Sequence, residues 1–449
     1  MIPKPEAKGS RYREILLLAA PIIAGMGSQI VFNLVDTAMV GRLGTESLAA
    51  VGLAGMAIWA SVSILQGLGP AVQAATARRL GEHDTARIHE SMINAGWLVL
   101  LTGVPYAMVL ILATPYLFEW LAGGNQNIRN HGIDYMTIRL LGLVFLGLNN
   151  GFRGYYNGRK MANIYMFTLL SIHPLNILLN YLLIFGKWGF PEMGVAGAAL
   201  GTTIATGLGC LNFARLMFKH RGDNGLKLFS VSRNTIKVLL AQAIPNCTRT
   251  ITLAFGVLMF FTIAARIDEE GKALAATKVL VELALVCLHL SMGFGMAALT
   301  LISSALGEGS REQARAWLRT VLFLGCSVLT VTGLILALFP NFWLGCFGLD
   351  QEVIRLASAP LVILGLMQCY DAAAMILSYA HLGSGAAKRA MMISVANQWF
   401  IFLPACFIWV QWFDGQLIHL WICMACFRFL LFLSFLASIR GNEWLRVAV

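Results

Sequence analysis

Long apolar runs dominate this chain and constrain its fold more than any other feature. Twelve stretches have the length, about 20 mostly apolar residues, that a helix needs to cross a membrane. They lie near residues 14–40, 48–78, 88–115, 133–156, 163–186, 193–218, 235–265, 273–305, 313–338, 355–381, 389–411 and 417–440. Only 12% of the residues are charged, about half the share in soluble domains. We therefore expect an all-α polytopic membrane protein, which excludes soluble enzymes and nucleic-acid-binding proteins.

The basic residues indicate how the spans are oriented. They gather in alternate connections, at the N-terminus and near residues 78–87, 159–160, 219–237, 311–315, 388–389 and 440–446. Such residues mark the cytoplasmic side, so we expect both termini to be cytoplasmic. The net charge of +11 then reports orientation rather than a nucleic-acid partner. No short apolar core with a cleavage site precedes the first span, so we predict no cleavable signal peptide.

The longest basic connection divides the predicted spans six and six. We predict a cytoplasmic N-terminus (1–13), an N-lobe (14–218), a cytoplasmic linker (219–234), a C-lobe (235–440) and a cytoplasmic C-terminus (441–449). The segment that begins at Leu48 recurs without a gap at Leu274. This match superposes glycine on glycine, Gly67 on Gly293 and Gly69 on Gly295. An even number of spans in each half predicts two six-helix bundles related by a pseudo-twofold axis along the membrane normal.

A proline occupies a similar place in the first span of each half. Pro21 matches Pro245 at nearly the same spacing as the repeated segment. Proline inside a helix removes a backbone hydrogen bond and permits a bend. Two facing halves enclose a cleft, and rocking about that cleft gives alternating access. We predict that Pro21 and Pro245 are helix-bending residues.

Polar side chains in the first half suggest a cation site. Asp36 and Asn33 share a helical face in the first span, Asn176 and Asn180 share one in the fifth, and Thr202 opens the sixth. A charge at membrane depth costs at least roughly 2.5–3.5 kcal/mol, so such residues usually face a cavity or a partner. A carboxylate with amide and hydroxyl oxygens can bind a proton or a hard cation such as Na⁺. The alternative is that Asp36 only joins neighbouring helices by a hydrogen bond.

The second half carries a different set of polar residues. Glu282 lies in the eighth span four residues after Lys278, so an ion pair between them is the alternative to a functional acid. Gln368 and Asp371 share a face of the tenth span, where Asp371 has no obvious partner in its own helix. Arg249 in the seventh span could neutralise either acid. We expect contacts with a cation or with the substrate from Glu282, Asp371, Arg249 and Gln368.

The N-terminal residues resemble those of the multidrug and toxic compound extrusion (MATE) family. "NLVDTAMVGRLGTESLAAVG" is similar to the first-helix pattern of that family, with Asp36 at its acid position. "NILLNYLLIFG" and "GVAGAALGTT" place Asn176, Asn180 and Thr202 on positions that form an N-lobe cation cluster with that acid. Some members have aspartate where this chain has Asn180. The resemblance implies cation coupling there, with Na⁺ as one candidate ion at Asp36, Asn176 and Asn180.

The C-terminal residues resemble sodium-coupled members of the same family. Glu282 and Asp371 match the acids of their eighth and tenth helices. Those members often carry a glutamate in the seventh helix, whereas the nearest charge here is Arg249, of opposite sign. This departure means that the ion specificity of those members does not transfer simply to this chain.

The family resemblance implies a V-shaped, two-lobe antiporter of the bacterial inner membrane. Such a protein exports bulky, often cationic aromatic compounds in exchange for H⁺ or Na⁺. It is not an enzyme, needs no cofactor beyond the coupling ion, and is expected to be a monomer among membrane lipids. The main alternative is a lipid-linked oligosaccharide flippase of the same superfamily, which we disfavour because only Arg249 stands out as a deep arginine. A receptor or channel is a further alternative, and the sequence leaves the coupling ion and the exported compounds open.

Overall fold

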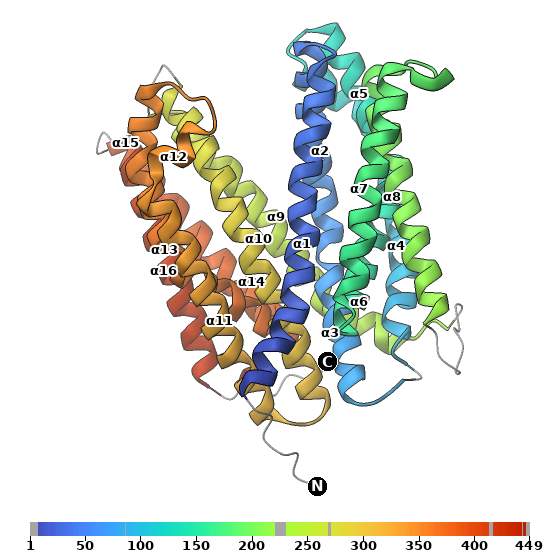
Figure 1. Ribbon diagram of the computed structural model, residues 1–449, viewed down its shortest axis with the longest axis vertical. Coiled ribbons are helices and arrows are strands. Elements are labelled where there is room, and N and C mark those ends of the chain that lie inside the picture. The colour runs from blue at the N-terminus through green and yellow to red at the C-terminus, as the bar shows by residue number, and fades with distance from the viewer. Residues whose placement is uncertain are drawn as a thin grey trace. The chain divides into compact units, whose positions relative to one another are not determined.

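The computed structural model describes residues 8–85, 87–220, 230–267, 271–412, 416–441 and 443–445 (Figure 1). Parts of the predicted cytoplasmic segments 1–13, 219–234 and 441–449 lie outside the described residues. The described residues form helices and no strand. The N-terminal helices are α1 Lys8–Gly41, α2 Thr45–Gln66, α3 Leu68–Gly81, α4 Glu90–Leu121, α5 Gln126–Leu141, α6 Leu143–Gly158, α7 Ala162–Phe185, η1 Lys187–Gly189 and α8 Gly194–Lys219. The C-terminal helices are α9 Arg233–Ala264, α10 Lys272–Gly307, α11 Arg311–Leu338, α12 Pro340–Gly345, α13 Gln351–Gly383, α14 Ala387–Ala396, η2 Asn397–Phe402, α15 Leu403–Trp412, α16 Leu417–Arg440 and η3 Glu443–Leu445.

The number of membrane-crossing helices agrees with the apolar runs. Eleven helices within the described ranges are long and apolar enough to cross a membrane, and the bent pair α5 and α6 brings the number to twelve. The pair bends by 47°, a feature that the single predicted span 133–156 did not contain. The prediction of an all-α polytopic membrane protein is confirmed.

The chain divides into two compact units whose boundaries lie inside helices. The unit that we call the N unit comprises Ala24–Ala243, and the C unit comprises the chain up to Ile23 together with Ile244–Val449. One boundary therefore falls inside α1 just after Pro21, and the other falls inside α9 just before Pro245. The predicted lobes divide in the loops instead. The beginning of each half's first helix thus belongs to the other half's unit.

Packing shows why the beginning of α1 belongs to the C unit. A Cβ atom added to Gly293 of α10 would lie only 2.3 Å from Cγ1 of Ile23, so the missing side chain makes room for α1. The guanidinium of Arg11 lies 5.5 Å from the ring centroid of Trp317 in α11, a cation–π contact. Ile15 and Ala19 are fully buried.

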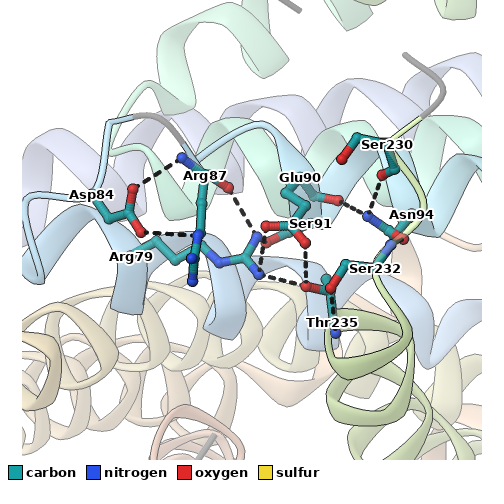
Figure 2. A network of polar contacts seen from close by, with 9 residues as sticks. All are labelled: Arg79, Asp84, Arg87, Glu90, Ser91, Asn94, Ser230, Ser232 and Thr235. Carbon is teal, nitrogen blue, oxygen red and sulfur yellow. Dashed lines mark hydrogen bonds and ion pairs between the residues drawn. The ribbon is translucent and has the colours of Figure 1, made fainter. Parts of the chain in front are cut away.

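The beginning of α9 is fastened to the N unit by a polar network (Figure 2). The Thr235 hydroxyl donates to Oε1 of Glu90 at 2.8 Å and accepts a hydrogen bond from Nη2 of Arg79 at 2.7 Å. Arg79 and Glu90 also form an ion pair at 3.4 Å. Asn94 of α4 accepts from the backbone N–H of Ser232 at 2.9 Å. The first turn of α9 is therefore held to α3 and α4.

The internal repeat reappears as the same packing contact in each unit. In the N unit, a Cβ atom on Gly158 of α6 would lie 2.7 Å from the carbonyl oxygen of Gln73 in α3. In the C unit, a Cβ atom on Gly383 of α13 would lie 2.8 Å from the carbonyl oxygen of Leu299 in α10. Gln73 and Leu299 occupy equivalent positions in the gap-free repeat. Glycine at these points lets two membrane helices approach closely.

The two halves differ where the first half carries an additional proline. Pro70 has no N–H to donate to the carbonyl of Gln66, and the helix is interrupted between α2 and α3. Nδ2 of Asn150 in α6 donates to the carbonyls of Leu65 and Gln66 at 3.0 and 2.9 Å instead. The equivalent of Pro70 in the second half is Met296, and α10 continues through it.

Candidate functional site

The candidate site of the N unit centres on Asp36. This residue lies five residues before the end of α1. Nδ2 of Asn180 in α7 donates to Oδ1 of Asp36 at 2.6 Å. Asn180 is fully buried and Asp36 is half-buried. Two predicted site residues that are 144 positions apart in the chain are therefore in direct contact.

In the described part of the chain, buried oxygen atoms without donors lie on α7 next to this contact. Asn176, one turn before Asn180 on α7, is only 3% exposed. The Oδ1 atoms of Asn176 and Asn180 have no hydrogen-bond partner among the described residues. The hydroxyl of Thr202 in α8 donates to the carbonyl of Ala198 at 2.8 Å, which leaves its oxygen able to accept. A buried acceptor without a donor costs about 1–3 kcal/mol, so these oxygens favour a bound cation, a proton donor or water.

Small residues on α8 position the site. A Cβ atom on Gly201 would lie 2.2 Å from Oδ1 of Asn180, and one on Gly197 would lie 2.5 Å from the carbonyl oxygen of Leu183. The glycine-rich start of α8 therefore allows that helix to pack directly against α7. Because Gly201 faces Asn180, the same packing sets how the Asn180 amide is presented to Asp36.

Asn33 belongs to a neighbouring set of contacts. Its Oδ1 atom accepts from Nε2 of Gln29 at 3.0 Å. The Gln29 side-chain oxygen lies 3.2 Å from Nε2 of His173 in α7. The His173 ring stacks on Phe32 with the ring centroids 5.2 Å apart. Asn33 thus bonds toward His173 rather than toward Asp36, and its side chain is exposed.

Sequence reasoning missed Arg139 of α5. Its charge acts on Asp36, and its guanidinium is hydrogen-bonded to Tyr135 one turn earlier. Nε and Nη1 of Arg139 are buried and have no partner among the described residues. Arg139 lies inside the predicted span 133–156, where an arginine is costly. That cost was the signal that could have identified it.

The structure pairs Asp371 of the C unit with a second arginine that sequence reasoning missed. Nη1 of Arg428 in α16 lies 3.0 Å from Oδ1 of Asp371 in α13, and the two side chains are 22% and 12% exposed. Gln368, on the same face of α13, is 1% exposed and donates to the carbonyl of Leu364 at 3.0 Å. Its Oε1 atom has no partner within the described part of the chain.

Arg249 of α9 contacts neutral groups. Its Nη1 and Nη2 atoms donate to Oγ of Ser378 at 2.6 Å and to Oδ1 of Asn246 at 2.9 Å. Asp371 therefore obtains its counter-ion from α16, and Arg249 does not supply it. Ser378 lies two turns after Asp371 on α13, so both arginines are fastened to that one helix.

Glu282 of α10 stands apart from these contacts. Its side chain is exposed, and it makes no hydrogen bond or ion pair with a described residue. The alternative ion pair with Lys278 is therefore not formed. Among the described residues, no hydrogen bond or ion pair joins Glu282, Arg249, Gln368 and Asp371 to one another. The second half consequently holds separate polar positions instead of one carboxylate cluster.

Comparison with protein families matches each half of the chain separately. The MatE family model matches residues 21–182 and again residues 246–408. The two matches therefore begin beside Pro21 and Pro245, the equivalent prolines of the internal repeat. The repeat inferred from the sequence is thus confirmed.

Curated relatives match over most of their length. A probable multidrug resistance protein NorM of Thermotoga maritima is 27% identical over 458 residues, which covers 100% of this chain and 96% of the relative. A probable multidrug resistance protein NorM of Rhizobium meliloti is 28% identical and covers 81% of this chain and 79% of the relative.

Solved structures share the fold. A crystal structure of MATE in complex with MaL6 superposes with a TM-score of 0.89 at 22% identity, covering 97% of this chain and 98% of that one. A MOP superfamily transporter from Pyrococcus furiosus, described as having a binding pocket of reverse polarity, superposes with a TM-score of 0.87 at 22% identity. That comparison covers 98% of this chain and 97% of the other.

Proposed function

This chain belongs to the MatE family, and from that premise we propose that it is a secondary active multidrug efflux antiporter. It exports bulky, often cationic aromatic compounds in exchange for H⁺ or Na⁺ by rocking-type alternating access. A relative described as a probable multidrug resistance protein matches the whole chain, and this match supports the proposal. The observation that carries it is the Asp36 carboxylate on a membrane-crossing helix, bonded to a buried amide and bordered by open oxygen atoms.

The cation-coupling role falls to Asp36, Asn176, Asn180 and Thr202. A structural role as a helix-joining hydrogen bond accounts for the contact between Asp36 and Asn180. It does not account for the two buried acceptors left without donors on Asn176 and Asn180. A cation that enters this site changes the stability of whichever state offers the better ligands. Such a differential preference is all that coupling requires.

The C unit supplies substrate contacts in this proposal. Asp371 already has its counter-ion in Arg428, so a positively charged substrate must compete with that arginine for the carboxylate. The half-buried Arg249 offers hydrogen-bond donors to a substrate, and the unsatisfied Oε1 atom of Gln368 offers an acceptor. Glu282, exposed on α10, remains a candidate for contact with either the substrate or a cation.

The decisive experiment is drug efflux from proteoliposomes under imposed proton and sodium gradients, applied separately. Asp36→Asn keeps the size of the side chain and removes its charge. We expect efflux under whichever gradient drives the wild type to fall at least about tenfold, equivalent to about 1.4 kcal/mol, with unchanged amounts of protein in the membrane. The matched control is Asp134→Asn on α5, an exposed aspartate, for which efflux stays at the wild-type level. Wild-type efflux by Asp36→Asn rejects the coupling role.

A lipid-linked oligosaccharide flippase remains the second candidate because of the additional arginines. The structure adds Arg139 and Arg428 to Arg249 as cations on membrane-crossing helices. Two of these three arginines interact with an aspartate, Arg428 with Asp371 and Arg139 with Asp36. The net positive charge available to a polyanionic substrate is therefore smaller than three arginines would provide. Translocation of a fluorescent lipid-linked oligosaccharide, with no efflux of aromatic cations, favours the flippase.

We further propose a monomer in the bacterial inner membrane with both termini in the cytoplasm. The basic connections between the spans support this orientation. Labelling of a cysteine introduced at either terminus of a variant that lacks the nine native cysteines, by a membrane-impermeant maleimide, tests it. Reaction in intact cells, before permeabilisation, contradicts the orientation.

A further inference from the structure

Arg139 of α5 is a cation whose charge acts on Asp36 and to which the proposed coupling role gives no part. We propose that its guanidinium is the resident counter-cation of Asp36 and excludes Na⁺ from this site. Arg139 is then a residue that determines ion specificity. This inference rests on the proposed function, because that function makes the site the place of ion coupling. Na⁺ binding can nevertheless be measured without any transport.

Packing places the end of α5 beside the Asp36 site in the N unit. Tyr135 of α5 belongs to the same buried cluster as Val40, one turn after Asp36 on α1, and Ile184, one turn after Asn180 on α7. Arg139 lies in the last turn of α5, three residues before Gly142. Tyr135, one turn earlier and only 6% exposed, is hydrogen-bonded to Arg139. Asp36 itself receives the hydrogen bond from Asn180. The carboxylate of α1 therefore accepts from a neutral amide of α7, and the charge of Arg139 on α5 acts on it without a direct ion pair.

The charge balance of this group opposes a metal cation. Among the described residues, the contacts around Asp36 include no second carboxylate, and Asn176, Asn180 and Thr202 are neutral. Asp36 and Arg139 together have no net charge, and a guanidinium does not lose its proton in proteins. A Na⁺ ion at the open oxygens would face a fixed positive charge at an effective dielectric constant well below that of water. Without Arg139 the same oxygens would carry one net negative charge.

Unsatisfied groups of both kinds support the assignment. Arg139 has two buried donor atoms without partners, Nε and Nη1, while Asn176 and Asn180 have buried acceptors without partners. In this proposal, the positive charge of the guanidinium stabilises the electron-rich amide oxygens, which would otherwise be stabilised by a bound cation. The last turn of a helix also favours a cation, because the carbonyl groups there carry the negative end of the helix dipole. The position of Arg139 at the end of α5 is thus favourable in two respects.

The test measures ²²Na⁺ binding to the purified protein in detergent, with choline chloride keeping the ionic strength constant. We expect no saturable binding that depends on Asp36 in the wild type, so wild type and Asp36→Asn bind alike. Arg139→Met keeps the length of the side chain and removes its charge. This variant is expected to gain saturable Na⁺ binding at least about tenfold tighter than any wild-type binding. The double variant Arg139→Met/Asp36→Asn should lose that gain.

Two further variants separate charge from structure. Arg139→Lys restores the cation and is expected to remove Na⁺ binding again. Arg153→Met is the matched control, since Arg153 is a half-buried arginine of the same unit that bonds to Asn150 rather than to the Asp36 site. It should leave Na⁺ binding unchanged. Thermal unfolding of each variant verifies that the measured protein is folded.

The outcomes distinguish this inference from the proposed function. Saturable, Asp36-dependent Na⁺ binding by the wild type overturns the role of Arg139 and leaves a sodium-coupled antiporter standing. A folded Arg139→Met variant that does not bind Na⁺ also overturns it and indicates a purely structural arginine. Absence of drug efflux under every gradient rejects the antiporter, whatever the Na⁺ binding data show.

Discussion

At the scale of single residues, two aspartates on membrane helices differ in how their charge is compensated. Asp371 forms a direct ion pair with Arg428 at 3.0 Å. Breaking a buried pair of this kind typically costs about 3–5 kcal/mol, which ties Asp371 to the stability of the C unit. Asp36 accepts a hydrogen bond from the neutral amide of Asn180. The charge of Arg139 acts on it electrostatically, without a direct ion pair. The more weakly held carboxylate is the better candidate for reversible cation binding.

Gly201 offers a test of how the Asn180 amide is positioned. In Gly201→Ala, the added methyl group would lie 2.2 Å from Oδ1 and 3.1 Å from the backbone nitrogen of Asn180. Asn180 must move, so we expect the hydrogen bond to Asp36 to weaken and gradient-driven efflux to fall at least about fivefold, equivalent to about 1 kcal/mol. Proteoliposome efflux measures the effect.

Gly207→Ala on the same helix is the control for that test. An added methyl group there meets only the Phe145 ring, at an ordinary contact distance of 3.4 Å. We expect its efflux to match the wild type. A Gly201→Ala protein with wild-type efflux would show that the position of Asn180 is not important for coupling.

At the scale of elements, the hydropathy pattern predicted where the membrane-crossing helices lie, but it did not predict where they are interrupted. The span predicted at 273–305 is α10 at Lys272–Gly307, because a membrane-crossing run is a local property of the sequence. The span predicted at 48–78 is two helices separated at Gly67, and the one at 133–156 is a bent pair. Carbonyl groups at the first break are satisfied by Asn150, a distant partner that a hydropathy window does not contain.

The repeated glycine contact predicts equal effects in the two units. In Gly158→Ala and in Gly383→Ala, the new methyl group would lie 2.7 Å and 2.8 Å from a backbone carbonyl oxygen of the neighbouring helix. Backbone cannot move aside cheaply, so we expect each change to destabilise its unit by about 1–3 kcal/mol. The unfolding temperature in detergent measures it.

Gly55→Ala on α2 is the control for this pair, because nothing lies within 4 Å of the added methyl group. Its unfolding temperature should equal or exceed that of the wild type, since alanine is the better helix former. If only one of the two glycine variants is destabilised, the two contacts are not equivalent.

At the scale of the whole molecule, two helices connect the units. α1 passes from the C unit to the N unit two residues after Pro21, and α9 passes from the N unit to the C unit just before Pro245. The first turn of α9 is held by the network around Thr235, and the start of α1 is held by Arg11 and Ile23. In the proposed rocking mechanism, the bending has to occur near the two points where these helices pass between the units, and a proline lies next to each point.

Pro21→Ala and Pro245→Ala test that mechanism. Alanine restores the backbone hydrogen bond that proline removes, so the helix resists bending. We expect initial rates of efflux to fall at least about tenfold, equivalent to about 1.4 kcal/mol in the barrier, with drug affinity in detergent unchanged. Pro105→Ala, inside α4 and within one unit, should leave the rate unaltered. Equal rates in all three variants contradict a hinge at these positions.

The sequence alone determined the all-α fold, the number of spans and the repeat. It also identified Asp36 as a carboxylate inside a membrane-crossing run, where a charge is energetically unfavourable. Each follows from a local penalty, because lipid rejects polar side chains and unpaired backbone groups wherever they occur along the chain. Tertiary structure decided which groups meet. Asp36 bonds to Asn180 at 144 positions' separation, Asp371 bonds to Arg428 at 57, and the charge of Arg139 acts on Asp36 from another helix. These partners depend on how helices pack against one another, and periodicity along a single helix carries no information about that.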